Sequence, residues 1–393
     1  MIENECMYMN EFQRHTLSTD QNTSQGVDGL RFPLLGLYGE VGSLLSALKK
    51  KQRDQASYLG YEESVIEEFG DVLWYFSNIA ARASLDLSVL AQRMSRTLED
   101  WDETEPHEFG TFGDIQPLSS TREPFTSSLY EQRLIELAGK TGRLLDDVAG
   151  NRVEHNRDVL AGHLVEIFRA LVAAADEANV CLDRVALRNI AKTSSRWPSP
   201  TERVYPPLFD EADDPEEQLP RRIELDIRER GSTGRKYVRL RCNGVNIGDR
   251  LTDNKADQDD YRFHDVFHLA YCAILGWSPV IRALFKTKRK SNGNLDETQD
   301  GARATLVEEG ISTWIFSHAV KLNYFASISS LDYPLLKTVQ AQVQGYEVQS
   351  CPLWLWEKAI LDGFAVFRCL REAREGIVVA DMIERSISFK PAT

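Results

Sequence analysis

Apolar residues recur every three or four positions between Arg31 and Trp101, and this spacing limits the possible fold more than any other feature of the sequence. An α-helix brings residues three and four apart onto one face, so the pattern predicts amphipathic helices rather than strands. Gln52–Tyr61, a polar connection that contains Gly60, separates the two helical segments. The apolar positions are Leu34, Leu37, Leu44, Leu45 and Leu48, then Val65, Phe69, Val72, Leu73, Phe76 and Ala80.

A second helical block at 125–200 looks like a divergent copy of the first. LYGEVGSLL at Leu37–Leu45 aligns without a gap to LAGKTGRLL at Leu137–Leu145. Repeated helical hairpins predict two tandem units, 1–105 and 125–200, which pack on each other into one bundle. Once the intervening loop is shortened, the further matched pairs are Leu87 with Leu182, Leu90 with Val185, and Ala91 with Ala186.

The composition changes after residue 200. Several prolines beside the acidic run DEADDPEE (Asp210–Glu217) are typical of a linker, which we place at 201–220. RRIELDIRER and RKYVRLRC then flank GSTG, and this alternation around a turn sequence predicts a β-hairpin within Arg221–Cys242. From Tyr261 onward the pattern is helical again. We therefore expect a mainly α chain, in which a bundle of two tandem units precedes an α-rich domain, 221–393, that begins with the β-hairpin.

Charge and composition argue against several classes of protein. The formal net charge is -14 over 393 residues, whereas general binding to nucleic acids or anionic membranes needs positive charge. The sequence has no run of about 18 consecutive apolar residues that would span a membrane, and we expect no secretory signal. Six dispersed cysteines without a CxxC pair indicate reduced thiols, so we expect a cytoplasmic protein.

Four carboxylates in the first unit are candidates for a metal site. Glu68 and Asp71 are three residues apart, so a helix projects both from one face, with Glu67 at its flank. Glu40 lies in the preceding helix, where the glycines of GLYGEVG permit close helix approach. Converging carboxylates repel one another unless a cation neutralises them, and hard oxygen ligands select Mg²⁺ or Mn²⁺. The alternative is a solvated acidic face, which residues at this spacing usually form.

Two segments of this unit, GLYGEVGSLLSALKKKQRD and EEFGDVLWYFSNIA, resemble the MazG-type all-α nucleoside triphosphate pyrophosphohydrolase family. That family carries ExxE, a spacer and ExxD on the helices of a bundle that holds Mg²⁺. Glu40 matches the first acid of ExxE, while Glu68 and Asp71 match ExxD. Ser43 replaces the second acid of ExxE, and Glu67 either compensates in the metal shell or acts as general base.

The resemblance implies Mg²⁺-dependent hydrolysis of NTPs or dNTPs, or of a related pyrophosphate such as an alarmone, to a monophosphate and pyrophosphate. The expected catalytic residues are Glu67, Glu68 and Asp71. Lys50 and Arg53 are candidates for neutralising the triphosphate, and Asn78 for contacting the nucleotide or a carboxylate. Two functional alternatives stay open: a nucleotide-sensing protein in which Ser43 marks a decayed centre, and a bifunctional protein with a second metal-dependent hydrolase site at His264 and His268. The oligomeric state, monomer or homodimer, also stays open.

In the second unit the equivalent positions are Lys140, Arg143, His163 and Glu166. Only one of these four is acidic, so we expect this unit to bind no metal. It is expected to complete the bundle as an intramolecular partner of the first unit. Lys140 and Arg143 either face phosphate or close the bundle.

The C-terminal block contains a second candidate site. YRFHDVFHLAY places His264 and His268 four residues apart, so a helix presents both on one face, where they can bind one metal ion. Alternatively, the histidines pack in a helical core and the charges are solvated. The segment Arg262–Ile315 resembles a C-terminal domain associated with MazG-type proteins, which implies no chemistry of its own. The candidate residues are His264, Asp265, His268, Lys288, Arg289, Asp300, Arg303, Glu308 and Glu309.

Overall fold

The computed structural model describes residues 6–22, 26–95, 110–116, 128–153, 156–232 and 234–392. It divides into two compact units, Met1–Glu202 and Arg203–Thr393, and each has its own apolar core. The mainly helical first unit and the mixed second unit confirm the predicted fold class. The predicted bounds at 105 and 125, and most of the polar stretch between them, lie outside the described residues.

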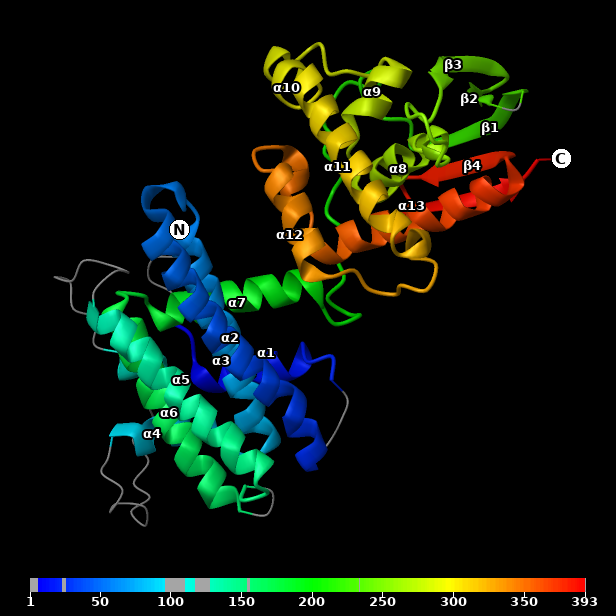
Figure 1. The fold of residues 1–393 in the computed structure, drawn as a ribbon. Coiled ribbons are helices and arrows are strands. Elements are labelled where there is room, and N and C mark those ends of the chain that lie inside the picture. Colours follow the sequence, from blue (N-terminus) through cyan, green and yellow to red (C-terminus); the bar gives the residue numbers. More distant parts are fainter. Residues whose placement is uncertain are drawn as a thin grey trace. The chain divides into compact units, whose positions relative to one another are not determined.

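The N-terminal unit consists of helices joined by short connections (Figure 1). The apolar stripes predicted from the sequence face its core, where Leu37, Leu44, Val65 and Phe69 are fully buried. Short 3₁₀ turns lie at Gln55–Ser57 and Gly113–Ile115. The helices are α1 (Met9–Ser18), α2 (Gly26–Asp54), α3 (Tyr61–Arg82), α4 (Leu87–Ser95), α5 (Ser128–Ala149), α6 (Arg157–Glu177) and α7 (Leu182–Arg196).

Helix pairing in this unit is reciprocal between its two halves. α2 packs on α3, and α5 packs in the same way on α6. α2 also contacts α5, while α7 covers α3 and α4 covers α6. The last helix of each half therefore packs on the second helix of the other half. This arrangement is expected of two related units around an approximate two-fold axis. One consequence is that α7 of the second half lies against the polar edge of α3.

Glycine allows the close approach of α2 and α3 at one position. A Cβ on Gly36 would lie 2.2 Å from the ring of Tyr75 on α3, so any larger residue would push the two helices apart. Gly39 and Gly42, from the same glycine-rich segment, would meet nothing within 4 Å. The predicted close approach is therefore present, and it depends on Gly36 rather than on its two neighbours.

The C-terminal unit contains a five-stranded antiparallel sheet with the order β3-β2-β1-β4-β5. The predicted hairpin is β1 with β2, and Gly231 is required at its end because φ is +103° and a Cβ would lie 2.2 Å from the carbonyl oxygen of Arg235. The expectation of helix throughout the rest was wrong for the last two strands. The strands are β1 (Arg222–Ser232), β2 (Arg235–Cys242), β3 (Val245–Leu251), β4 (Glu375–Asp381) and β5 (Ser386–Pro391).

Helices pack against this sheet, and α13 contacts α8, β4 and β5 (Figure 1). Within the part of the chain that the structure describes, no single helix is long and apolar enough to cross a membrane, although one bent pair, Tyr261–Leu275 with Pro279–Phe285, together passes that test. Turns lie at Tyr261–Phe263, Asn323–Phe325 and Glu347–Ser350. The helices are α8 (Asp265–Ala270), the π-helical η5 (Tyr271–Leu275), α9 (Pro279–Phe285), α10 (Gly293–Thr298), α11 (Ala302–Val320), α12 (Tyr333–Gln342) and α13 (Leu353–Ala373).

Residues 201–220, which composition predicts as a linker, instead pack as part of the C-terminal unit from Arg203 onward. Asp210 is fully buried and accepts a hydrogen bond from the backbone N–H of Leu219 at 2.7 Å. Its carboxylate also pairs with Arg221 at 2.7 Å and Arg282 at 2.9 Å. A buried carboxylate held by two arginines anchors the segment, a non-local interaction that composition alone does not reveal.

Candidate functional sites

Three of the four predicted carboxylates converge in the N-terminal unit. Glu40 on α2 and Glu68 and Asp71 on α3 each offer an oxygen, and these oxygens lie within 4.8 Å of one another. The close packing of α2 on α3 at Gly36 positions them, since Glu40 is one helical turn further along α2. The sequence-based grouping of these three residues is thus reproduced in space.

The cluster carries more negative charge than its surroundings can stabilise. Burial, together with a hydrogen bond from Glu68 to Glu40, raises the pKa of Glu68 from 4.5 to about 8. Burial also raises the pKa of Asp71 from 3.8 to about 6, although Lys192 opposes this shift. A hydrogen bond between two carboxyl groups requires one of them to keep its proton. The site therefore holds a proton at neutral pH in the place where a cation would neutralise it.

Lys192 and Asn189 of α7 complete the cluster, and the sequence reasoning missed both. The ammonium group of Lys192 lies 2.6 Å from Asp71 and 3.1 Å from Glu67. The amide of Asn189 donates a hydrogen bond of 3.0 Å to Asp71. Gly70 permits this contact, because a Cβ there would lie 3.1 Å from Cβ of Asn189. Glu67 is thus paired with Lys192 at the edge of the three converging carboxylates.

Basic residues follow one face of α7. Arg184, Arg188, Lys192 and Arg196 are spaced four apart, which places them along one side of the helix. Lys192 reaches the carboxylates, and the charge of Arg196 acts on Tyr75, whose pKa burial and the charge of Glu40 raise. The four-residue spacing was visible in the sequence and could have identified this basic face.

The predicted substrate-binding residues lie elsewhere. Lys50 and Arg53 are exposed near the end of α2, and Lys50 is ten residues, or about 15 Å of helix, beyond Glu40. Arg53 pairs with Asp54 at 2.7 Å. Asn78 is fully buried and donates a hydrogen bond of 3.2 Å to the carbonyl oxygen of Trp74. The structure therefore does not bring these three residues to the carboxylate cluster.

In the second half of the bundle the corresponding positions neutralise one another. The ammonium group of Lys140 lies 2.5 Å from Glu166, and Arg169 pairs with the same carboxylate. His163 lies 2.6 Å from Asp147. Opposite charges meet at these described positions, where the first half brings like charges together, so the carboxylates here are already neutralised by neighbouring side chains.

A second cluster lies in the C-terminal unit and joins α8 to α11. Nε2 of His268 is 3.4 Å, and Nε2 of His264 3.9 Å, from Oε2 of Glu309. Asp265 lies 3.3 Å from the same nitrogen of His264. His268 is completely buried, whereas the Glu309 side chain is 38% exposed, so the cluster is open on the side of Glu309.

Glu308 plays a different part from its neighbour. Its buried carboxylate accepts hydrogen bonds from Nδ1 of His268 at 2.9 Å, the hydroxyl of Ser278 at 2.6 Å and the backbone N–H of Val280 at 2.9 Å. Burial opposes charging of His268, yet Glu308 and Glu309 raise its pKa well above the ordinary value. Burial likewise opposes ionisation of Glu309, but its interaction with His268 lowers its pKa.

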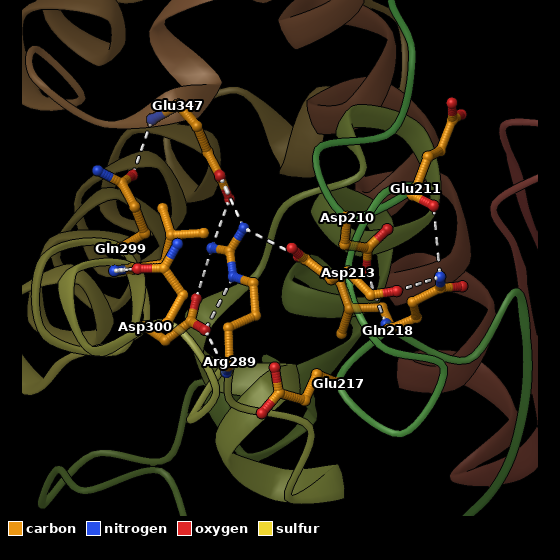
Figure 2. Close-up of polar contacts among 12 residues, drawn as sticks. Asp210, Glu211, Asp213, Glu217, Gln218, Arg289, Gln299, Asp300 and Glu347 are labelled. Carbon is orange, nitrogen blue, oxygen red and sulfur yellow. Dashed lines mark hydrogen bonds and ion pairs between the residues drawn. The ribbon is translucent and has the colours of Figure 1, made fainter.

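Two of the other residues predicted for this second site, Arg289 and Asp300, belong to a separate ion-pair network (Figure 2). Arg289 is buried, donates to both oxygens of Asp300 at 2.7 and 3.0 Å, and also pairs with Glu347 at 2.9 Å. Its donors are used within the protein, so Arg289 and Asp300 stabilise the fold. Lys288 is partly buried and Arg303 is exposed.

Comparisons with known proteins address the C-terminal unit most directly. Residues 204–393 match the family model described as the MazG C-terminal domain. The Gene 37 protein of Mycobacterium phage L5 is 32% identical over 75 residues, which make up 19% of this chain and 66% of that protein, slightly less than two thirds of its length. No family model of a MazG pyrophosphohydrolase domain matches the N-terminal part, and no solved structure matches the chain. The matched range coincides with the second compact unit, which is therefore similar to the MazG C-terminal domain over its whole length.

Proposed function

We propose that the N-terminal unit is a Mg²⁺-dependent pyrophosphohydrolase of nucleoside triphosphates. The observation that carries this proposal is the convergence of Glu40, Glu68 and Asp71 on two packed helices, with a proton retained among them. A solvated acidic face would leave such carboxylates apart in water, with ordinary pKa values. The MazG C-terminal domain in the same chain supports the assignment, because the N-terminal segments resemble the MazG-type enzymes.

The donor set suits a hard divalent ion. Glu40, Glu68 and Asp71 offer only oxygen ligands, which Mg²⁺ and Mn²⁺ prefer. When bound there, Mg²⁺ would polarise a phosphoryl group and lower the pKa of a nearby water. Ser43 stands on α2 where the family pattern has a further acid, so the proposal uses one ion held by these three carboxylates.

The residues around the ion supply the remaining functions. Lys192 and Arg196 of α7 offer positive charge to the phosphates, a role that Lys50 and Arg53 are too distant to fill. Tyr75 lies next to Glu40, and its ring meets that of Phe32 edge to face at 6.3 Å. These two rings form an aromatic surface on which a nucleobase could stack.

The proposed reaction adds water across the bond between the α- and β-phosphates. The water oxygen bonds to phosphorus, the bridging P–O bond breaks, and a monophosphate and pyrophosphate leave. The proton lost by the water passes to Glu67, whose carboxylate accepts a hydrogen bond of 3.1 Å from Lys192.

The test is turnover of an NTP and dNTP panel by the full chain with Mg²⁺, with pyrophosphate and phosphate measured separately. Glu68→Gln and Asp71→Asn should each lower kcat by about 100-fold or more. Glu62→Gln is the matched control, because Glu62 is exposed on the same helix and outside the cluster. Release of phosphate alone, or full activity in both cluster variants, would exclude this site as the centre.

A second candidate function follows from Lys192. Its ammonium group supplies positive charge to Asp71 and Glu67, the place where a catalytic cation would act. If this charge takes the place of the ion, the unit binds nucleotides without hydrolysing them. Wild-type protein would then bind an NTP without turnover, and Lys192→Gln would gain Mg²⁺ binding. Turnover by the wild type that falls in Lys192→Gln would instead assign Lys192 to the phosphates.

A further inference from the structure

In both histidines of the C-terminal cluster, Nδ1 donates a hydrogen bond within the protein and Nε2 faces Glu309. Nδ1 of His264 lies 2.9 Å from the carbonyl oxygen of Tyr261, which can only accept, so this nitrogen carries a proton. Nδ1 of His268 lies 2.9 Å from the carboxylate of Glu308, which also accepts hydrogen bonds from Ser278 and Val280. Both Nδ1 atoms are committed as donors, which leaves the two Nε2 atoms to face Glu309.

The second observation is that Nε2 of His268 lacks a hydrogen bond within the described part of the chain. It is buried and has no hydrogen-bond partner of good geometry among the described residues, with Oε2 of Glu309 at 3.4 Å as its neighbour. Buried polar atoms are usually satisfied, so an unsatisfied imidazole nitrogen aimed at a carboxylate points to a missing ligand.

The separations fit a bound metal ion. Two ligand atoms about 2.05 Å from a tetrahedral ion lie about 3.3 Å apart. The distances here are 3.3 Å between Asp265 and His264, 3.4 Å between His268 and Glu309, and 3.9 Å between His264 and Glu309. The ligand atoms of His264, His268 and Glu309 all lie within 4.8 Å of one another, close to the spacing that one ion requires.

We propose that His264, His268 and Glu309 bind a divalent transition-metal ion, with Asp265 beside Nε2 of His264 at 3.3 Å. Two imidazole nitrogens with carboxylate oxygens favour Zn²⁺, Mn²⁺, Fe²⁺ or Co²⁺ over Mg²⁺, which prefers oxygen alone. Glu308 and the Tyr261 carbonyl fix the orientation of the two imidazoles, the usual role of groups behind metal-binding histidines. The exposure of Glu309 leaves the ion accessible to water or a small ligand.

This site is independent of the N-terminal carboxylates and of the function proposed for them. It lies in the other compact unit and uses nitrogen ligands, so its metal preference differs. The π-helical turn η5 directly follows the helix that carries His268, and such turns often occur at functional sites.

The experiment titrates Co²⁺ into full-length, chelator-treated protein and follows the visible absorption of the ion. Wild type should bind one equivalent at this site, with the absorption of a nitrogen- and oxygen-ligated ion. His264→Gln and Glu309→Gln should weaken binding by about 10–100-fold or more. His318→Gln, a histidine on α11 outside the cluster, and Asp71→Asn, in the N-terminal cluster, should leave it unchanged.

Circular dichroism shows whether each variant is folded, and Glu309→Gln, at a partly exposed position, keeps the test valid if a histidine variant does not fold. Zn²⁺ retained after gel filtration should follow the same order. Undiminished Co²⁺ binding in folded Glu309→Gln and His264→Gln would overturn the proposal. So would folded wild type that gives no absorption at micromolar Co²⁺, and the cluster would then be a buried imidazolium–carboxylate pair.

Discussion

Binding of Mg²⁺ to the N-terminal carboxylates should release about one proton at pH 7. Glu68, with a pKa of about 8, is then about 90% protonated, and Asp71, with a pKa of about 6, about 10% protonated. An ion can bind only the ionised carboxylates, so the protons held by Glu68 and by Asp71 must leave when it binds. The two fractions, about 0.9 and about 0.1, add to about one proton. At pH 9 the same sum falls to about 0.1, because Glu68 is mostly ionised before the ion binds.

Titration calorimetry measures this number when the full chain is titrated with Mg²⁺ in buffers of different ionisation enthalpy. Glu68→Gln should reduce proton release at pH 7 to about 0.1, which is the share left to Asp71. Glu62→Gln, outside the cluster, should release as many protons as wild type. Proton release near zero in the wild type at pH 7, or release unchanged in Glu68→Gln, would refute the reasoning from the shared proton.

The same shift makes the stability of the metal-free protein depend on pH. Because the folded pKa of Glu68 is raised, the folded state binds more protons than the unfolded state between pH 4.5 and about 8. The free energy of unfolding should therefore fall as the pH rises through this window. The full shift corresponds to about 5 kcal/mol, which screening by solvent at the partly exposed Glu68 reduces to about 2–3 kcal/mol. Urea unfolding at pH 5.5 and 8 measures the loss, and saturating Mg²⁺ should reduce it.

Further predictions concern packing and the buried arginine. Gly36→Ala places a methyl group 2.2 Å from the Tyr75 ring and should destabilise the N-terminal unit by about 1–3 kcal/mol in urea unfolding. Gly39→Ala, which meets nothing within 4 Å, should instead stabilise it by about 0.5–1 kcal/mol. Arg289→Met removes both side-chain hydrogen bonds to the buried Asp300, leaves it the longer contact of 3.5 Å with Arg282 as its ion pair, and should cost about 3–5 kcal/mol, measured on the C-terminal transition; a loss below 1 kcal/mol would contradict a structural role.

The helices of the N-terminal unit could be predicted because their signal is local. Leu37, Val65 and Phe69 repeat at helical spacing, and each helix buries the face that the spacing defines. The strands β4 and β5 gave no such signal, because the short apolar run around Val378 fits a helix as well as a strand. In the sheet, Val378 of β4 pairs with Leu225 of β1, so the two paired strands are separated by most of the sequence of the C-terminal unit. Such long-range pairing decides the outcome and cannot be read from a short window.

The two sites show the same limit at the level of single residues. Helical spacing brought Glu68 and Asp71 together correctly, whereas Lys192 reaches them only because the second half of the bundle lends α7 to the first. Adjacent residues of a helix point about 100° apart, so Glu308 and Glu309 cannot face the histidines in the same way. The sequence alone does not indicate which of the two, Glu308 or Glu309, faces the ring Nε2 atoms. Only the structure shows that the former holds an imidazole in place while the latter faces both histidines.

The reciprocal packing also explains how the diverged half can matter for a site that it does not contain. Lys140 and Glu166 neutralise each other on α5 and α6, so this pair leaves no negative charge for a cation to balance. Helix α7 of the second half packs on α3, where Lys192 and Asn189 contact the carboxylates of the first half. The two halves are therefore complementary at this site, with acids on α3 and bases on α7. A site of this kind needs both halves in one bundle, because its carboxylates lie on α3 and the lysine and asparagine that contact them lie on α7.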